Sequence, residues 1–168
     1  MTTNTSELSN GAWKLDQDNS SVEFHVRHFY GLMTVKGHFD SYDGTIDLSA
    51  SPAIELKIEA DSLDTGHEKR DKHLRSADFF GVEETPEVRF TSDTATLAGE
   101  TLKVTGQLEA GGKSVPLSFD AKVQGAGEDL SIYAEVEVDH RELGMTWSPL
   151  GIMRAPSKLV VQGKLKRA

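Results

Sequence analysis

The chain has 168 residues, a net charge of −9 at pH 7 and no cysteine. A chain of this length fits one domain that buries most of its apolar surface. The missing cysteines exclude disulfides, thiolate nucleophiles and cysteine metal ligands. The acidic balance disfavours nucleic acid as a partner, because its phosphates would be repelled.

The first ten residues are polar, and they predict a disordered N-terminal tail before a single domain over residues 11–168. The tail lacks the basic and apolar segments of a secretion signal. No run approaches the ~20 apolar residues that cross a bilayer. We therefore expect a cytoplasmic protein without stable membrane insertion.

Alternating apolar and polar residues predict a series of β-strands. In the first strand, Val22, Phe24 and Val26 alternate with polar side chains as far as His28. Further strands are predicted over residues 35–39, 45–48, 54–60, 88–91, 102–108, 115–123, 130–138 and 158–165, with turns at 30–31, 43–44, 98–100, 111–112 and 125–127. Many short strands with one apolar face are typical of an all-β sheet that closes around a core or a small ligand.

A single helix is predicted over about residues 65–80, between two groups of strands. Thr65 and Glu68 have the spacing of a capping box at its start. Leu74 lies on a short apolar edge, and Phe79 and Phe80 follow it. The charged side chains expected in solvent on the other face are Glu68, Arg70, Asp71, Lys72 and Arg75. Such a helix is suited to covering one end of a barrel.

The apolar rows identify the residues expected to line the interior. They are Phe24, Val26, Phe39, Leu48, Leu56, Ile58, Phe90, Val104, Phe119, Val136 and Val138. By strand alternation, His28 also faces inward, near a strand end. Two roles are open for His28: a core histidine bonded to a backbone carbonyl, or a hydrogen-bonding partner of a ligand head group.

Two apolar clusters are candidates for the rim of a pocket. The first hairpin carries Tyr30 and Met33, and the segment of residues 144–154 carries Met145, Trp147 and Met153. Flexible methionines adapt well to a hydrocarbon tail. For the second cluster, packing on the outside of the barrel or a homodimer contact are the alternatives. Trp13, near the start of the domain, is expected to be a packed plug at one end.

Catalytic and metal-binding patterns are weak. His67, Asp71 and His73 resemble a set of metal ligands, but His67 and His73 stand six residues apart, about 240° around a helix, whereas ligands on one face need a spacing of four. The sequence contains no Ser-centred nucleophile elbow and no phosphate-binding loop. We expect no catalytic residue, no metal and no required cofactor.

Several motifs resemble one known family. They are Trp13-x-Leu-Asp16, Ser21-Val-x-Phe-x-Val-x-His28, Val35-x-Gly-x-Phe39, Arg70-Asp-x-His-Leu-x-Ser-x-Asp-Phe-Phe80, Thr85-Pro-x-Val-x-Phe-Thr-Ser92 and Val138-Asp-x-Arg-x-Leu-Gly-Met145. Together they resemble the YceI-like, polyisoprenoid-binding family along nearly the whole chain. The resemblance implies an eight-stranded, lipocalin-like antiparallel barrel. It also implies a long isoprenoid chain inside, such as a polyprenyl phosphate or a quinone tail.

We therefore expect a binding protein, not an enzyme, that stores, transports or protects an isoprenoid lipid. Two alternatives stay open. One is an enzyme that acts on a small hydrophobic substrate, with His28 as acid or base. The other is a stress-related structural or interaction protein whose interior is filled, because inward side chains alone do not distinguish a filled core from a cavity.

Overall fold

The computed structural model describes residues 11–28, 33–48, 52–126, 129–143 and 153–167. At residues 27–28, 33–34, 126, 129, 140 and 153–156 the description covers the backbone alone. The predicted tail over residues 1–10 lies outside this part of the chain.

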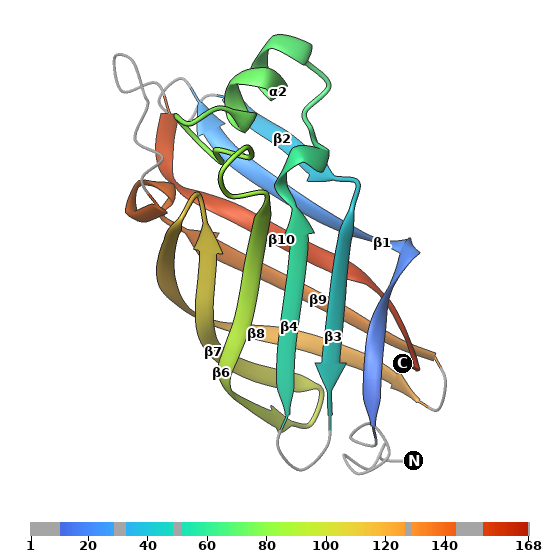
Figure 1. Ribbon diagram of the computed structural model, residues 1–168. Coiled ribbons are helices and arrows are strands. Elements are labelled where there is room, and N and C mark those ends of the chain that lie inside the picture. Colours follow the sequence, from blue (N-terminus) through green and yellow to red (C-terminus); the bar gives the residue numbers. More distant parts are fainter. Residues whose placement is uncertain (1–10, 29–32, 49–51, 127–128, 144–152, 168) are drawn as a thin grey trace.

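The described residues form ten strands, one α-helix and two short 3-10 helices (Figure 1). In chain order these are β1 Ala12–His28, β2 Met33–Phe39, β3 Tyr42–Asp47, β4 Ala53–Glu59, η1 Ala60–Ser62, β5 Leu63–Asp64, α2 Glu68–Arg75, β6 Glu87–Ala98, β7 Thr101–Ala110, β8 Lys113–Ala126, β9 Asp129–Val138, η2 His140–Leu143 and β10 Met153–Arg167.

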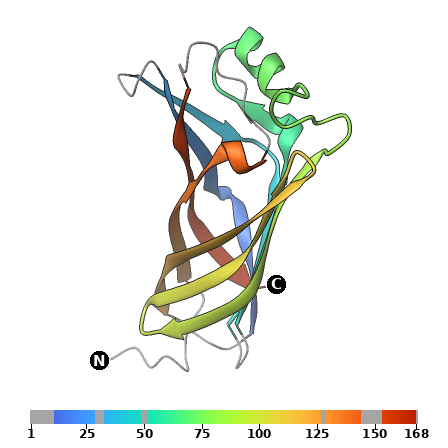
Figure 2. The ribbon, with the colours of Figure 1, turned by 90° about the vertical axis from the view of Figure 1, so that its left-hand side faces the viewer.

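The sheet closes on itself. Its strand order is β10-β9-β8-β7-β6-β4-β3-β1-β2-β5, and β10 pairs again with β1. Eight of the ten described strands therefore form a ring, while β2 and β5 extend beside the second half of β1. The pairings around the ring are antiparallel. The predicted eight-stranded antiparallel barrel is confirmed, and Figure 2 shows it from the side.

The long strand β1 makes this arrangement possible, because it changes partner along one edge. Residues 12–14 pair with β3 and residues 23–28 pair with β2, whereas the other edge follows β10. Between these parts, four residues of β1, Asp16 to Asn19, stand opposite a single residue of β10. The Asp16 carboxylate accepts hydrogen bonds from the Asn19 side-chain amide at 2.8 Å and from the Asp18 N–H at 3.2 Å. The Asn19 bond lowers the pKa of Asp16 below its usual value. Such a bulge bends and twists its strand.

The eleven residues predicted to face inward all belong to the packed interior. Nine are buried, and Val26 and Phe119 are partly buried against the same core. In β7 the burial alternates residue by residue, as expected for a strand with one face on a core. The strand pattern was therefore sufficient to predict which side chains point inward.

One end of the barrel is closed by Trp13, whose side chain is 1% exposed. The Arg167 guanidinium lies 4.4 Å from the centre of the Trp13 ring, within the range of a cation–π contact. The fully buried Leu48, Leu102 and Leu130 belong to the same end, where β1 begins and β10 ends. Trp13 is the end plug that the sequence predicted.

Two of the predicted turns are confirmed and one is wrong. The chain turns after β6, and again at Gly111–Gly112, whose positive φ angles of 59° and 78° suit a tight hairpin. The predicted turn at residues 43–44 instead lies inside β3. A Cβ at Gly44 would lie 3.3 Å from the Leu56 side chain, a tight contact that a small shift of Leu56 would have to relieve. Of the turn predicted at 125–127, residue 125 is still in β8 and residue 127 lies outside the described part.

The predicted helix is shorter than expected and has a different cap. It spans Glu68–Arg75, not 65–80, and is followed by turns as far as residue 80. The His67 side chain is the N-cap, and its Nδ1 accepts a hydrogen bond from the Arg70 N–H at 3.3 Å. The capping box at Thr65 is therefore wrong.

Thr65 instead belongs to a buried polar contact. Its hydroxyl donates to Asp71 at 2.5 Å and accepts from Arg70 Nε at 2.8 Å, while its N–H also donates to Asp71 at 2.9 Å. Asp71, expected in solvent, is 7% exposed. It faces inward because the segment before the helix folds back over it and supplies hydrogen-bond donors.

This contact gives a stability prediction. Thr65→Val removes the hydroxyl but keeps the shape, so the Asp71 carboxylate and Arg70 each lose a partner. We expect the free energy of unfolding to fall by ~1–3 kcal/mol, the usual cost of an unsatisfied buried group, as measured by urea denaturation. Thr65→Ser keeps the hydroxyl and is the matched control. A loss in Thr65→Ser with none in Thr65→Val would show that the methyl group, not the hydrogen bonds, matters.

Candidate functional site: an apolar interior in two parts

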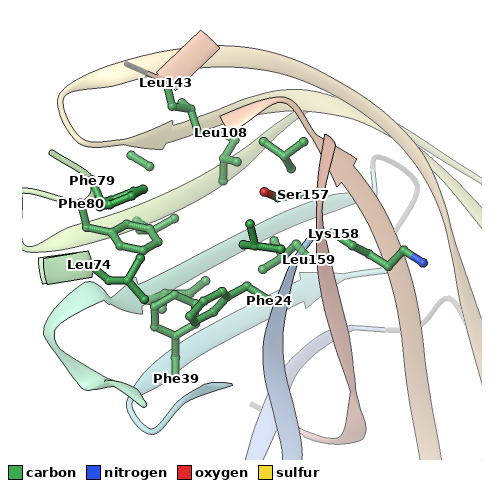
Figure 3. A pocket seen from close by; sticks show the side chains of 15 residues that line it. Phe24, Phe39, Leu74, Phe79, Phe80, Leu108, Leu143, Ser157, Lys158 and Leu159 are labelled. Carbon is green, nitrogen blue, oxygen red and sulfur yellow. The ribbon is translucent and has the colours of Figure 1, made fainter. Parts of the chain in front are cut away.

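A cavity of about 90 Å³ lies under α2, at the barrel end opposite Trp13, and Figure 3 shows the side chains around it. Strands from around the ring contribute its wall, and α2 with the turns after it contributes the roof. The lining residues are Phe24, Val26, Phe39, Ile58, Leu74, Phe79, Phe80, Val88, Leu108, Ala110, Val138, Leu143, Ser157, Lys158 and Leu159. Nearly all of this wall is hydrocarbon, so it suits an apolar group.

Three aromatic rings form the part of this wall nearest to β2. The ring centres of Phe24 and Phe39 are 5.2 Å apart, and Phe80 meets both rings edge-on at 6.3 Å and 5.9 Å. Gly37 makes room for this packing, because a Cβ at that position would lie 2.3 Å from the Phe24 ring. The absent side chain in β2 thus allows Phe24 to take its place beside the cavity.

Polar bonds on its outer side hold α2 in place as a roof. Arg75 donates to the carbonyl oxygens of Asp61 and Leu63 at 3.0 Å and 2.8 Å, and Arg70 donates to that of Thr65 at 2.9 Å. On the inner side, Leu74 is buried against the core. The helix therefore covers the cavity through one apolar edge, as its sequence indicated.

A second cavity, of about 60 Å³, lies deeper in the barrel. Its wall includes the predicted residues Leu56, Phe90, Phe119 and Val136. Leu108 and Leu159 line both cavities, so these two side chains stand between the upper and the lower space. The interior is thus divided into two small apolar compartments.

The upper wall offers almost no polar group to a ligand. Lys158 contributes its hydrocarbon stem, while its ammonium forms an ion pair with Glu135 at 2.5 Å and points away from the cavity (Figure 3). The hydrogen bond from Lys158 lowers the pKa of Glu135. Ser157 carries the one hydroxyl among the described lining residues. The described wall therefore favours an uncharged tail over a charged head group.

The predicted ligand-binding residues are distributed between the two compartments. The upper cavity is lined by Phe24, Val26, Phe39, Ile58 and Val138, and the lower by Leu56, Phe90, Phe119 and Val136. Leu48 and Val104 line neither of these cavities, because they are packed in the solid core.

The predicted rim is only partly described. Tyr30, Met145 and Trp147 lie outside the described residues. For His28, Met33 and Met153 the backbone is described, and His28 pairs with the other two across the sheet. The pairing places these three positions side by side at the end of β1.

The predicted ligand-binding set leaves out several residues of the wall, among them Leu108, Leu143, Leu159 and Ala110. Leu108 and Leu159 fall in predicted strands, but alternation gives only the face of a strand. Alternation does not show how far along the barrel axis a residue lies, so it did not indicate that these two residues lie between two cavities.

Three histidines whose side chains the structure describes have identifiable partners. His67 caps α2, and His73 Nε2 lies 2.8 Å from Asp78. Pairing of β2 with β5 brings His38, Asp40 and Asp64 together, with possible ligand atoms within 4.8 Å of one another. His38 Nε2 lies 3.0 Å from the Asp40 carboxylate on the exposed surface, and the Asp64 carboxylate accepts a hydrogen bond from the Gly66 N–H at 2.8 Å.

A family model described as the YceI-like domain matches residues 13–164. The chain belongs to the YceI-like family. It is 34% identical over 123 residues to the protein YceI of Salmonella arizonae, a match that covers 70% of this chain and 64% of that protein. The same values hold for protein YceI of Salmonella enteritidis. The match thus spans less than two thirds of the length of these relatives.

Solved structures share the fold. Burkholderia cenocepacia BcnA has a TM-score of 0.81 at 16% identity, over 90% of this chain and 98% of that one. A polyisoprenoid binding domain from Saccharophagus degradans has a TM-score of 0.76 at 15% identity, over 95% and 100%. Among the described residues, no helix has the length and apolar character needed to cross a membrane.

The upper cavity yields a prediction about packing. Ala110→Leu adds carbon atoms into free space, so we expect it to raise the free energy of unfolding by ~0.5–2 kcal/mol, measured by chemical denaturation of lipid-free protein. Ala60→Leu is the control, since Ala60 is fully buried and lines neither cavity. Overpacking there should cost ~1–3 kcal/mol. Destabilisation by both variants would indicate that the space under α2 is already filled.

Proposed function

We propose that this protein binds a lipid with a long apolar tail, of the isoprenoid class, inside the barrel, for storage, transport or protection. The observation that carries the proposal is the hydrocarbon-lined cavity under α2, at the end opposite the Trp13 plug. An apolar wall closed at one end suits a molecule that enters tail first. A tail would find hydrocarbon contacts on all sides there, and a head group would stay near the roof.

The family gives independent support. The structural neighbour from Saccharophagus degradans is a polyisoprenoid binding domain, although the low identity to it shows only a common fold. Membership of the YceI-like family also supports the proposed binding of an apolar ligand. We propose a binding role and not a catalytic one, because the described cavity wall has no pair of groups arranged for acid–base or nucleophilic chemistry.

Energetics limit how such a protein would work. Burial of one CH₂ group is worth ~0.8 kcal/mol against water, so a five-carbon unit gains very roughly 3–4 kcal/mol. A tail that leaves a membrane exchanges one hydrocarbon environment for another and gains little. The protein would therefore select its ligand through shape and through contacts at the head.

One observation favours a second candidate, an interaction protein whose interior is filled. Ligand pockets for small molecules commonly measure ~300–1,000 Å³, and each described cavity is far smaller. A long tail would enter only if side chains moved. The two functions therefore predict different behaviour of the same interior.

Native mass spectrometry of freshly purified protein, with organic extraction of the bound material, separates them. We expect an added mass that extraction identifies as a lipid with a long apolar tail. Ala110→Leu, which narrows the upper cavity, should reduce the bound fraction, while Ala60→Leu should not. A chain that carries no extra mass, and that acquires none when incubated with ubiquinone in detergent, would support the filled interior.

A separate prediction concerns His28, whose backbone lies at the end of β1. We propose that its side chain hydrogen bonds to the head group, since an imidazole in an apolar setting prefers its neutral form and then donates one bond and accepts another. His28→Phe should keep tail binding and weaken the choice between heads. Titration with two lipids of equal tail, a prenyl alcohol and the matching prenyl phosphate, tests this. Unchanged relative affinities in the variant would remove His28 from the site.

A further inference from the structure

Leu108 and Leu159 lie at the boundary between the upper and the lower cavity, because each lines both. Leu108 comes from β7 and Leu159 from β10, two strands separated in the ring by β8 and β9. The two side chains therefore approach the middle of the barrel from different parts of its wall. Figure 3 shows both among the side chains around the upper cavity.

The spaces on either side of these leucines are similar in character and small. They measure about 90 Å³ and 60 Å³, and an apolar cavity of roughly 150 Å³ is known to admit benzene. Neither compartment alone has room for more than a short piece of tail. A tail that extends from the upper into the lower compartment passes Leu108 and Leu159, which line both, and further side chains must move to make room for it.

The free space beside them gives these leucines room to move. A close-packed core side chain is held in one rotamer by its neighbours on all sides. A leucine with a cavity above and another below lacks part of that contact, so a change of rotamer meets less resistance. Leu159 is only partly buried, in contrast to the fully buried Leu102 and Leu130 at the closed end.

We propose that Leu108 and Leu159 set the length of tail that the barrel accepts. In one arrangement they close the upper compartment, which then admits only the end of a tail. When they turn aside, the two compartments join and a longer tail reaches down to the lower wall. The inference rests on the proposed binding function and adds to it the residues that decide tail length.

The test uses three all-trans prenyl alcohols with the same hydroxyl head: geraniol, farnesol and geranylgeraniol. Their affinities are measured by calorimetric titration from cyclodextrin solutions, for the full chain freed of lipid. The measured quantity is the ratio of the geranylgeraniol affinity to the geraniol affinity. For the wild type we expect this ratio to exceed about tenfold, because the longer tail buries more apolar surface.

A larger side chain at either leucine should lower that ratio, and a smaller one should raise it. Leu108→Phe and Leu159→Phe place larger side chains between the two compartments. Each should lower the ratio at least about tenfold, which corresponds to ~1.4 kcal/mol. Leu108→Ala leaves a smaller side chain between the two compartments and should raise the ratio. If a phenylalanine variant fails to fold, as judged by its thermal unfolding transition, the alanine variant still tests the inference.

Three control variants test whether a change in the ratio depends on the position of the substituted residue. Leu117→Phe fills the lower cavity from its outer wall and should lower the ratio as well. Leu143→Phe acts on the upper cavity alone and should weaken binding of all three alcohols by a similar factor. Tyr133→Phe alters an exposed side chain on the outer face and should leave the ratio unchanged.

The outcomes separate the inference from the function on which it rests. Wild-type protein that binds none of the three alcohols, and no ubiquinone, would overturn the proposed function. Wild-type protein that binds them, with variants at Leu108 and Leu159 that shift all affinities equally, would overturn only the role of the two leucines. A ratio that falls in the phenylalanine variants and rises in Leu108→Ala would support the role of the two leucines in setting tail length.

Discussion

The pairing of β10 with β1 is the constraint on which the rest of the structure depends. A sheet whose first and last strands meet has no strand in the ring with a neighbour on one side only, although β1 pairs with β3 over residues 12–14 alone. Closure also turns one face of every strand toward a common axis, where the apolar rows become a core. The bulge at residues 16–19 allows this, because it lets β1 pair with β3 at its start and with β2 at its end.

Closure creates two unlike ends. At one end Trp13 and the leucines around it pack tightly, and Arg167 covers the indole ring. At the other end the core is completed by a helix whose Arg70, Asp71 and Arg75 are bonded to the segment of residues 61–65 that precedes it. Strands converging on a solid plug leave little free space, whereas a separate helix placed over an opening leaves some. The cavity lies under the helix for this reason.

The distribution of charge follows from the same geometry. Strand alternation sends charged side chains outward, and even Lys158, which lines the upper cavity, directs its ammonium to Glu135 on the outside. The described interior is therefore nearly pure hydrocarbon. Such an interior would bind tails with little discrimination among them, so a binding function would take its selectivity from tail length and from the head.

The sequence by itself determined the fold class, the inward rows and the plug at Trp13, because period-two alternation and local turn chemistry are properties of short segments. It also indicated a helix over one end, since the short apolar edge at Leu74 is visible in the residues. It misassigned the cap to Thr65, because the hydroxyl had a better partner in Asp71, which only chain folding brings near. Only the tertiary structure decided that Gly44 lies in a strand and that Leu108 and Leu159 separate two cavities. Height within a barrel depends on register between strands distant in sequence, and no local pattern contains that register.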